Sequence, residues 1–302
     1  MLKGLVITPP VLGRISIGKV VEKAGKRLPE KDDQFTITSQ VQGADGWLTH
    51  PFDEGFRKAQ GGKIRAIPIR LLFNDPDLNF RAEYALFDRR SGRPVCVGNG
   101  ESCKRRTESG VQSLPCPSPE GCTLAQNGAC KPYGRLNVLI GDDDPLGSFV
   151  FRTTGFNSIR TLSARLAYFQ AISGNRLAYL PLELRLRGKS TRQSMGTPIY
   201  YVDLTVRSGV SVEDVLTEAK RLEADRQEAG FDQVALETAA RQGFSNGEFE
   251  ESDDEGDSVV EEFYAEGDGS RCDPSVATEK SAALSLADKM GNQMARLGRD
   301  AG

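Results

Sequence analysis

Residues 134–154 have the sequence GRLNVLIGDDDPLGSFVFRTT, in which two apolar runs flank a segment rich in glycine and aspartate. Short apolar runs bounded by turn-forming residues are typical of strands, and GDDDPLG is typical of a turn. The stretch therefore predicts a hairpin. This hairpin sets the fold class that we expect for the residues around it.

A helix and two strands are predicted after the hairpin. Apolar residues recur at three- and four-residue spacing in 157–175, which predicts a helix with one apolar face, ended by Gly174-Asn175. The segment 180–190 alternates, so its leucines are expected to point inward and its charged residues outward, and 198–206 resembles its partner strand. The outward residues of this strand would be Glu183, Arg185 and Arg187. Together these elements predict an α+β unit.

The segments 63–75 and 80–90 are also predicted strands, separated by the turn-forming NDPD at 74–77. We therefore expect residues 1–210 to form a mostly antiparallel β-sheet body with a packed central helix. From Ser211, which with Asp214 resembles a capping box, a charged helical pair is predicted over 211–243. Residues 244–302 are predicted to be a largely disordered acidic tail with a weak helical pattern near its end.

The charge of the chain is unevenly distributed. Residues 1–210 hold 30 Lys+Arg and 19 Asp+Glu, a formal charge of +11, whereas residues 211–302 hold 9 and 23, a charge of −14. A basic body with an acidic tail suggests contact with a polyanion and a tail that competes for the same surface. The alternative is that the tail only keeps the protein soluble.

The location predicted for the chain is cytoplasmic. The N-terminal residues lack the continuous apolar region and cleavage site of a signal peptide, and no stretch of eighteen apolar residues occurs. We therefore expect no contact with a membrane. In a reducing compartment, clustered cysteines are more often metal ligands than disulfides.

Five of the six cysteines lie within residues 96–130. Cys116, Cys122 and Cys130 close loops rich in proline and glycine, and thiolates suit the tetrahedral coordination of zinc. The fourth ligand would be Cys96 or Cys103, since the single histidine lies far upstream, and we favour Cys96. The prediction is a structural Zn²⁺; unrelated buried thiols, a redox pair or an iron–sulfur cluster are the alternatives.

Few residues suit catalysis. His50 is the only histidine and lies in a proline-containing loop, and a zinc ion with four thiolates has no open position for a water. The three aspartates at 142–144 suggest magnesium, but a solvated turn between strands is the favoured interpretation. No phosphate-binding glycine loop is present. We predict no catalytic residues and no enzymatic activity.

Basic residues form the remaining candidate site, with tyrosines between them. Phosphate contact and base stacking use these residue types, although an ordinary solvated sheet face would also explain them. The predicted nucleic-acid or partner contacts are Arg152, Arg160, Arg165, Arg185, Arg187 and Lys189.

Several motifs resemble the recombination directionality factor-like proteins of phages and integrative conjugative elements, some of which are labelled "hydrolase or metal-binding protein". The motifs are the spaced cysteines, Gly134-Arg135-Leu136, Thr154 with Ser158-Ile159, and 174–184. The resemblance implies a factor that binds a large serine integrase and switches it from integration to excision without catalysis. It also implies a zinc ion on Cys96, Cys116, Cys122 and Cys130. The helices and acidic tail after Ser211 depart from the family pattern.

The leading hypothesis is a non-enzymatic, zinc-stabilised accessory factor for DNA recombination or maintenance on a mobile element. Its partner would be a site-specific recombinase or another DNA-processing protein, DNA itself, or both. The alternative is a single-stranded nucleic-acid-binding protein autoinhibited by its acidic tail. A metal-dependent hydrolase is a third hypothesis. Whether EEFY at 261–264 is a docking motif is left open by the sequence.

Overall fold

The structure is a computed structural model that describes residues 10–23, 26–43, 46–142, 147–190, 198–244 and 263. Contacts divide the chain into residues 1–267 and 268–302, and the second unit lies outside the described residues. Of the predicted tail, 244–302, only Phe244 and Phe263 are described. No helix in the described part of the chain is both long and apolar enough to cross a bilayer.

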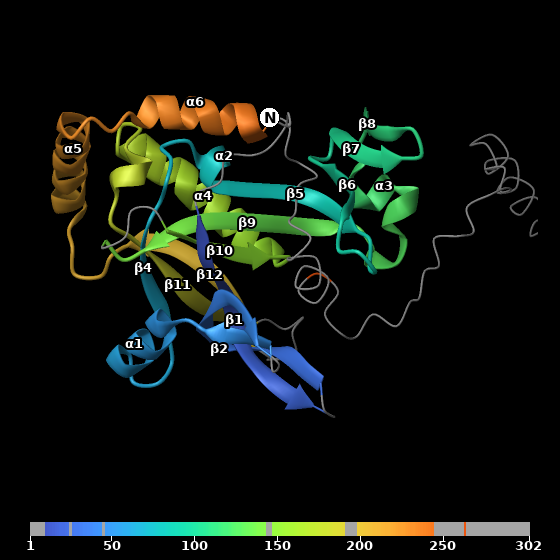
Figure 1. The fold of residues 1–302 in the computed structure, drawn as a ribbon, viewed down its shortest axis with the longest axis horizontal. Helices are drawn as coiled ribbons and strands as arrows, with labels where there is room; N and C mark the ends of the chain where they lie inside the picture. The colour runs from blue at the N-terminus through green and yellow to red at the C-terminus, as the bar shows by residue number, and fades with distance from the viewer. Residues whose placement is uncertain are drawn as a thin grey trace, which may run out of the picture. The chain divides into compact units, whose positions relative to one another are not determined.

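The fold is α+β with a mostly antiparallel sheet, as predicted (Figure 1). One sheet path has the order β3-β2-β1-β10-β9-β5-β6-β7-β8, and β4 branches from β9 to pair with β11, which pairs with β12. The strands are β1 Val11–Lys23, β2 Lys26–Gly43, β3 Gly46–Thr49, β4 Ala66–Arg70, β5 Phe80–Phe87, β6 Pro94–Gly98, β7 Ser102–Thr107, β8 Gly110–Pro115, β9 Lys131–Ile140, β10 Ser148–Thr153, β11 Leu182–Lys189 and β12 Ile199–Val206.

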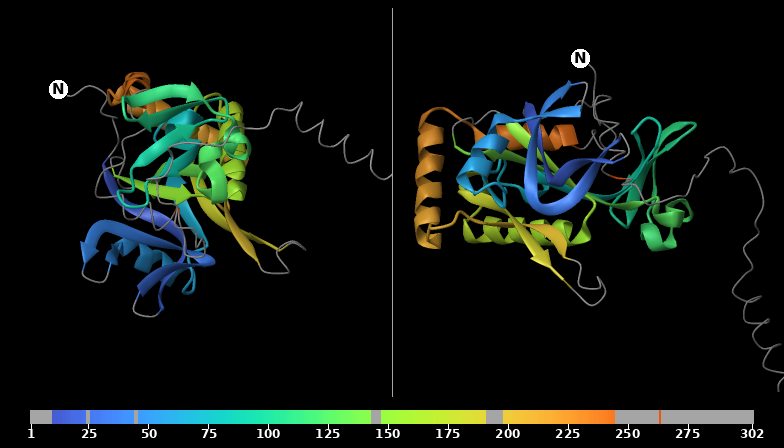
Figure 2. Two further views of the ribbon diagram at one scale, coloured as in Figure 1. Left: turned by 90° about the vertical axis from the view of Figure 1, so that its right-hand side faces the viewer. Right: turned by 90° about the horizontal axis from the view of Figure 1, so that it is seen from below.

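Six α-helices and two short 3₁₀ turns are found among the described residues. They are α1 Pro51–Ala59, α2 Pro76–Asn79, α3 Ser118–Gly121, α4 Phe156–Ile172, α5 Val212–Glu228 and α6 Gln233–Phe244, with the short 3₁₀ turns η1 Thr123–Gly128 and η2 Leu177–Tyr179. Figures 1 and 2 show α4 lying along the sheet and α5 at the end away from β6, β7 and β8, while α6 extends from that end past α2 toward the middle.

The quoted hairpin is present. Strands β9 and β10 pair antiparallel, with Leu136 opposite Phe151, and both side chains belong to the main apolar core. Strand β10 also pairs with β1 in the one parallel pairing among the described strands, with Ile15 opposite Phe151. This parallel pairing joins the N-terminal hairpin of β1 and β2 to the rest of the sheet.

The predicted central helix is confirmed as α4. Its buried face contains the expected periodic residues, which pack into the main core: Ile159, Leu162, Leu166 and Phe169. Gly174 and Asn175 adopt φ angles of +62° and +64°, so the predicted left-handed stop is also present. Gly134 on β9 lets α4 approach closely, because a Cβ there would lie 2.8 Å from the Phe80 ring and 3.1 Å from Ile159.

The upstream strands differ from the prediction in length. Strand β4 covers only Ala66–Arg70, and the expected turn at 74–77 continues into the short helix α2. Asp75 begins this helix because its carboxylate accepts a 3.0 Å hydrogen bond from the Asp77 N–H. Apolar density alone therefore overestimated the strand.

The two predicted C-terminal helices are present and pack against the body. The Ser211 hydroxyl accepts from the Asp214 N–H at 3.1 Å, which is the expected cap of α5. Helix α6 buries Ala240 against Phe73 and Leu78 near α2. The Asn74 N–H donates to Glu237 of α6 at 2.7 Å, so these helices are bound to the body by polar as well as apolar contacts.

Candidate functional site

The five described cysteines lie on β6 and β7 and in the connection from β8 to β9. Figure 1 shows β6, β7 and β8 at one end of the sheet. Cys96 on β6 lies opposite Arg105 on β7, and Cys103 lies opposite Gly98, so these side chains share one face of the hairpin. Gly98 makes room for this arrangement, since a Cβ at that position would be 2.6 Å from the Cys103 Cβ. The two predicted candidates for the fourth ligand are therefore neighbours.

The other three thiols come from the connection between β8 and β9. The Cys116 N–H donates to the Glu101 carbonyl at 2.9 Å, which places Cys116 beside the start of β7. Cys122 follows α3, and Cys130 directly precedes β9. Cys103 is buried, and the other four cysteines are half-buried.

The five thiols influence one another electrostatically. Burial first, and then the charges of the other four cysteines, raise the pKa of Cys130 to about 12. Burial and a hydrogen bond with Cys96 raise the pKa of Cys103 to about 11. The pKa of Arg105 is raised mainly by its hydrogen bond with Cys96. These thiols therefore lie near one another and beside one cation.

The donor set has the right chemistry for zinc, since thiolates are preferred ligands of that ion. Among the described residues, however, no three His, Cys, Asp or Glu side chains are arranged so that they could hold a metal ion as they stand. The thiols are thus close enough to interact through their charges but do not form a ready-made ligand group. Zinc on Cys96, Cys116, Cys122 and Cys130, with Cys103 as the alternative, stays a prediction.

The six predicted contact cations do not form one surface. Arg152 on β10 is only 8% exposed, so it lies inside the fold. The remaining five lie on two elements, α4 and β11: Arg160, Arg165, Arg185, Arg187 and Lys189.

Buried carboxylates hold most of these five side chains. Asp203 on β12, 6% exposed, accepts from Arg165 at 3.1 Å and from Arg187 at 3.3 Å. Arg185 pairs with Glu183, and Lys189 donates to the neutral side chain of Asn157 at 2.9 Å. These five cations on α4 and β11 and the two carboxylates Asp203 and Glu183 carry a net charge of +3, and we call them together the basic face of α4, β11 and β12.

Glu183 lies on the predicted outward side of β11, but its side chain is not exposed. Glu183 is buried, and it accepts from the hydroxyls of Thr205 and Ser208 at 3.2 and 3.1 Å. Burial opposes the charged form, but the Arg185 hydrogen bond is among the interactions that leave the pKa of Glu183 lowered. The alternation predicted the side of the strand correctly, but it could not predict that neighbouring side chains cover that side.

The aspartate loop has a structural role at Asp142. Its carboxylate pairs with Arg70 at 2.5 Å and with Arg207 at 2.6 Å, and these arginines lower the pKa of Asp142 to about 2. Arg70 is buried and also donates to Glu218 of α5 and to the Tyr179 carbonyl, at 2.6 and 2.8 Å. Asp142 thus has two arginine partners; the other two aspartates of the loop lie outside the described residues.

His50 begins helix α1. Its Nδ1 accepts from the Phe52 N–H at 3.2 Å, and its ring contacts Phe149 edge-on at 5.0 Å. Partial burial lowers the pKa of His50, which favours the neutral ring that this acceptor role requires. The sequence indicated a loop histidine but gave no sign of the cap.

Sequence reasoning missed Arg70, which connects β4 to α5 and which nothing in the pattern distinguished. Arg105 stood out only as one of the basic residues beside the cysteines, and its contact with the thiols was not predicted. The one available signal for Arg105 was its place in the run Lys104-Arg105-Arg106 beside Cys103.

The sequence model of the Gp3-like family, described as recombination directionality factor-like, matches residues 12–207. The chain belongs to this recombination directionality factor-like family. The matched residues cover the sheet and α4 and end before α5 begins, so α5, α6 and Phe263 lie beyond the family match. No curated protein and no solved structure matches the chain.

The motifs of the recombination directionality factor-like family have structural roles here. Gly134 gives α4 its close approach to β9, and Gly174 ends α4 with a positive φ angle. The Ser158 hydroxyl, buried at the start of α4, accepts from the Val202 N–H at 3.1 Å and so ties the helix to β12. The family motifs thus specify how α4 is seated on the sheet.

Proposed function

We propose that this protein is a non-enzymatic accessory factor for DNA recombination on a mobile genetic element. It binds a site-specific recombinase and biases that enzyme toward excision. The observation that supports this proposal is the family match over residues 12–207, which spans the sheet and α4. The family description names directionality of recombination, and the proposal extends that role to this chain.

The mechanism would be a shift between recombinase assemblies. A factor that binds the excision-competent assembly more tightly raises its population, and the shift cannot exceed the difference between its affinities for the two assemblies. A ten-fold preference for one assembly corresponds to about 1.4 kcal/mol. Binding alone therefore suffices, and the factor needs no catalytic group of its own.

The basic face of α4, β11 and β12 is the surface that we assign to the recombinase–DNA complex. Its arginines are held in place by Asp203 and Glu183, so little side-chain entropy remains to be lost on binding. Exposed Arg160 and half-buried Lys189 are not paired with either buried acid and are available for a substitution test.

The test is recombination between hybrid attachment sites by the recombinase of the same element, with purified components. Added protein should increase excision and suppress integration. The double variant Arg160→Glu/Lys189→Glu should weaken the effect at least ten-fold and should reduce the salt sensitivity of what remains, because fewer cations face the nucleic acid. Lys58→Glu/Arg221→Glu makes the same charge change on α1 and α5 and should behave as the wild type. Equal behaviour of both double variants would refute the assignment of this face, and no effect on direction would refute the function.

We also propose a structural zinc at the cysteine end, supported by five thiols at one end of the sheet with Arg105 beside them. Cys96, Cys116, Cys122 and Cys130 would hold the ion, with Cys103 as the alternative to Cys96. Elemental analysis of reduced, purified protein should find about one zinc per chain. Cys116→Ser/Cys122→Ser should remove it, whereas Ser113→Ala on β8 should not. A metal content near zero in the wild type would overturn this proposal while leaving the proposed function open to its own test.

A second candidate function is direct binding of single-stranded nucleic acid. It is favoured by tyrosines next to the cations: Arg187 lies opposite Tyr201 on β12, and the Lys189 Nζ is 5.8 Å from that ring. Such a protein would bind single strands without recombinase, with an affinity that falls steeply with salt. Replacing the acidic residues of 248–257 with their amides should then strengthen binding. If the variant with amides in 248–257 also binds DNA only together with the recombinase, this candidate is excluded.

A further inference from the structure

Two aromatic side chains lie on the outer face of the sheet near the cysteine end. The registers Glu83 opposite Tyr133 and Ala85 opposite Lys131 place these residues and Phe87 on one face of β5 and β9. Gly134 and Phe80 point to the other face, which α4 covers. We call the surface made by Ala85, Phe87 and Tyr133 the aromatic socket.

The aromatic socket is filled by Phe263. This side chain is 2% exposed, although the family match ends at residue 207. Its ring centroid lies 4.9 Å from that of Phe87 and 5.9 Å from that of Tyr133, and both contacts are edge-on. Phe87 and Tyr133 contact each other in the same way at 5.2 Å, so the three rings form one cluster.

Lys131 also contacts Phe263. The Lys131 Nζ donates to the Phe263 carbonyl at 3.4 Å and lies 5.7 Å from the centre of its ring. Phe263 is therefore bound through both its side chain and its backbone, which is how a peptide ligand is usually held.

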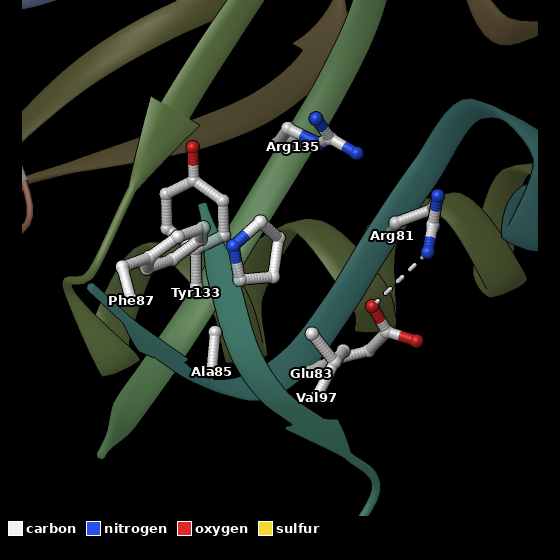
Figure 3. Close-up of a pocket in the computed structure, with 8 residues that line it drawn as sticks. Arg81, Glu83, Ala85, Phe87, Val97, Tyr133 and Arg135 are labelled. Atoms are coloured by element: carbon white, nitrogen blue, oxygen red, sulfur yellow. Dashed lines mark hydrogen bonds and ion pairs between the residues drawn. The ribbon is translucent and has the colours of Figure 1, made fainter. Parts of the chain in front are cut away.

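The surroundings of the aromatic socket are positively charged. Figure 3 shows Arg135 near the Tyr133 ring and Arg81 on the other side of the pocket from Phe87, where Arg81 pairs with Glu83 at 3.3 Å. Lys131, Arg81 and Arg135 against Glu83 give a net charge of +2. The sequence around Phe263, DSVVEEFYAEGD at 257–268, has five acidic residues and no basic ones. The charges of the site and of its occupant are thus complementary.

The space left beside the rings is small. A cavity of about 20 Å³ remains, lined by the two arginines, Glu83 and the aromatic rings, and this volume suits roughly one water molecule. Without Phe263, two aromatic rings would face solvent on a sheet, and such exposed apolar patches usually mark an interaction site.

We propose that the aromatic socket is a peptide-docking site for a phenylalanine in an acidic segment, and that Phe263 occupies it in cis. The family body thereby has an interaction surface that the chain's own extension covers. A partner segment of the same chemistry binds only by displacing Phe263, whose tether gives it a high effective concentration. This inference stands apart from the proposed function, because it involves neither recombinase nor DNA.

The experiment uses a fluorescent peptide of residues 257–268 and the full-length protein. Phe263→Ala protein, whose socket is empty, should bind the peptide at least ten-fold more tightly than the wild type. A peptide with alanine in place of the phenylalanine should not bind, and higher salt should weaken the wild-type peptide because the charges are complementary. Tyr264→Ala is the matched control in the protein and should behave as the wild type.

Two further variants keep the result interpretable if Phe263→Ala lowers stability. Phe263→Ala/Lys131→Glu should lose most of the gained affinity, because it removes the cation that contacts the phenylalanine but keeps Phe87 and Tyr133. Phe263→Ala/Phe87→Ala should lose all of it. Equal peptide binding by wild type and Phe263→Ala, or equal binding of the peptide that lacks phenylalanine, would overturn the proposal.

Discussion

The two ends of strand β9 are stabilised in different ways. At its carboxyl end, Leu139 and Ile140 are buried, and the following Asp142 pairs with Arg70 and Arg207. At its amino end, Lys131 and Pro132 are only half-buried, and Tyr133 belongs to a cluster of four residues that includes Phe263. One end thus rests on the main core and the other on a small satellite cluster.

One strand can therefore have an end fixed in the main core, which we call the scaffold end, and an end whose packing depends on a few residues outside that core. The scaffold end is fixed by contacts made within the folded body, including those to α5. The other end depends on thiols and on Phe263, which follows β12 by more than 50 positions in the sequence. Regions with few buried apolar contacts open at lower cost than the core, so we expect the cysteine end to respond first to perturbation.

Leu136→Ala should have the largest effect. The side chain is fully buried in the main core, and loss of its methyl groups should lower the free energy of unfolding by about 3 kcal/mol. Denaturant titration followed by circular dichroism would measure this change. Leu114→Ala on β8, whose side chain is only half-buried, is the control at the other end and should cost well under half as much.

Arg70→Met should have the next largest effect. The substitution keeps an apolar stem but leaves the Tyr179 carbonyl and Glu218 without their donor. Because Asp142 and Glu218 are partly solvated, we expect a loss of about 2 kcal/mol rather than the full value for a buried pair. Arg241→Met, which removes an exposed cation from α6, should cost under about 0.5 kcal/mol. Equal losses of unfolding free energy from the two substitutions would contradict the view that Arg70 connects Asp142, the Tyr179 carbonyl and Glu218.

Gly98→Ala should perturb the cysteine end selectively. The new Cβ would meet the Cys103 Cβ at 2.6 Å and the Ser102 carbonyl at 2.7 Å, so the β6–β7 hairpin must shift. We expect a local cost of about 1–2 kcal/mol. Hydrogen exchange should quicken in 94–115 and stay unchanged in 156–172. Gly55→Ala is the control, because a Cβ at that position meets open space. Gly110→Ala at the β7–β8 turn does not serve as a control, since its φ angle of +108° would strain any side chain.

Protonation of Asp142 at low pH should lower the free energy of unfolding, and this effect should be the smallest of the four predicted here. Its pKa is lowered from 3.8 to about 2, chiefly by Arg207 and Arg70, so its stabilising contribution is present above pH 3.8 and is lost as the pH falls toward 2. The carboxylate is 47% exposed, and solvent screening reduces the expected contribution to about 1 kcal/mol. Asp142→Asn should flatten this part of the stability–pH curve. Asp225→Asn, which breaks an exposed pair within α5, should cost under about 0.5 kcal/mol at neutral pH.

Local patterns predicted much of the fold. The periodic apolar residues of α4, the stop at Gly174-Asn175 and the β9–β10 hairpin were all visible, because each depends on residues close together in the sequence. The parallel pairing of β1 with β10 was not, because it joins segments more than 130 residues apart. Pairings of that kind follow from the packing of the whole body.

The candidate sites were less predictable for the same reason. The sequence indicated a thiol-rich segment and a row of cations on β11, but the carboxylates that hold those cations come from two strands, as Asp203 and Glu183. The aromatic socket could not be predicted, because one phenylalanine in an acidic segment has no periodic partner. The sequence left open whether EEFY is a docking motif or only a hydrophobic interruption of the tail, and only the structure connects its Phe263 to Phe87 and Tyr133.

The parallel pairing of β1 with β10 has a consequence for biosynthesis. The Ser148 N–H donates to the Pro10 carbonyl at 2.8 Å, and Val11 lies opposite Ser148, so β1 finds this neighbour only after more than 130 further residues have been made. Until then, one edge of the β1–β2 hairpin lacks this neighbour, and unpaired strand edges favour association with other chains. A nascent chain of this protein should therefore need protection by chaperones until residue 153 has left the ribosome.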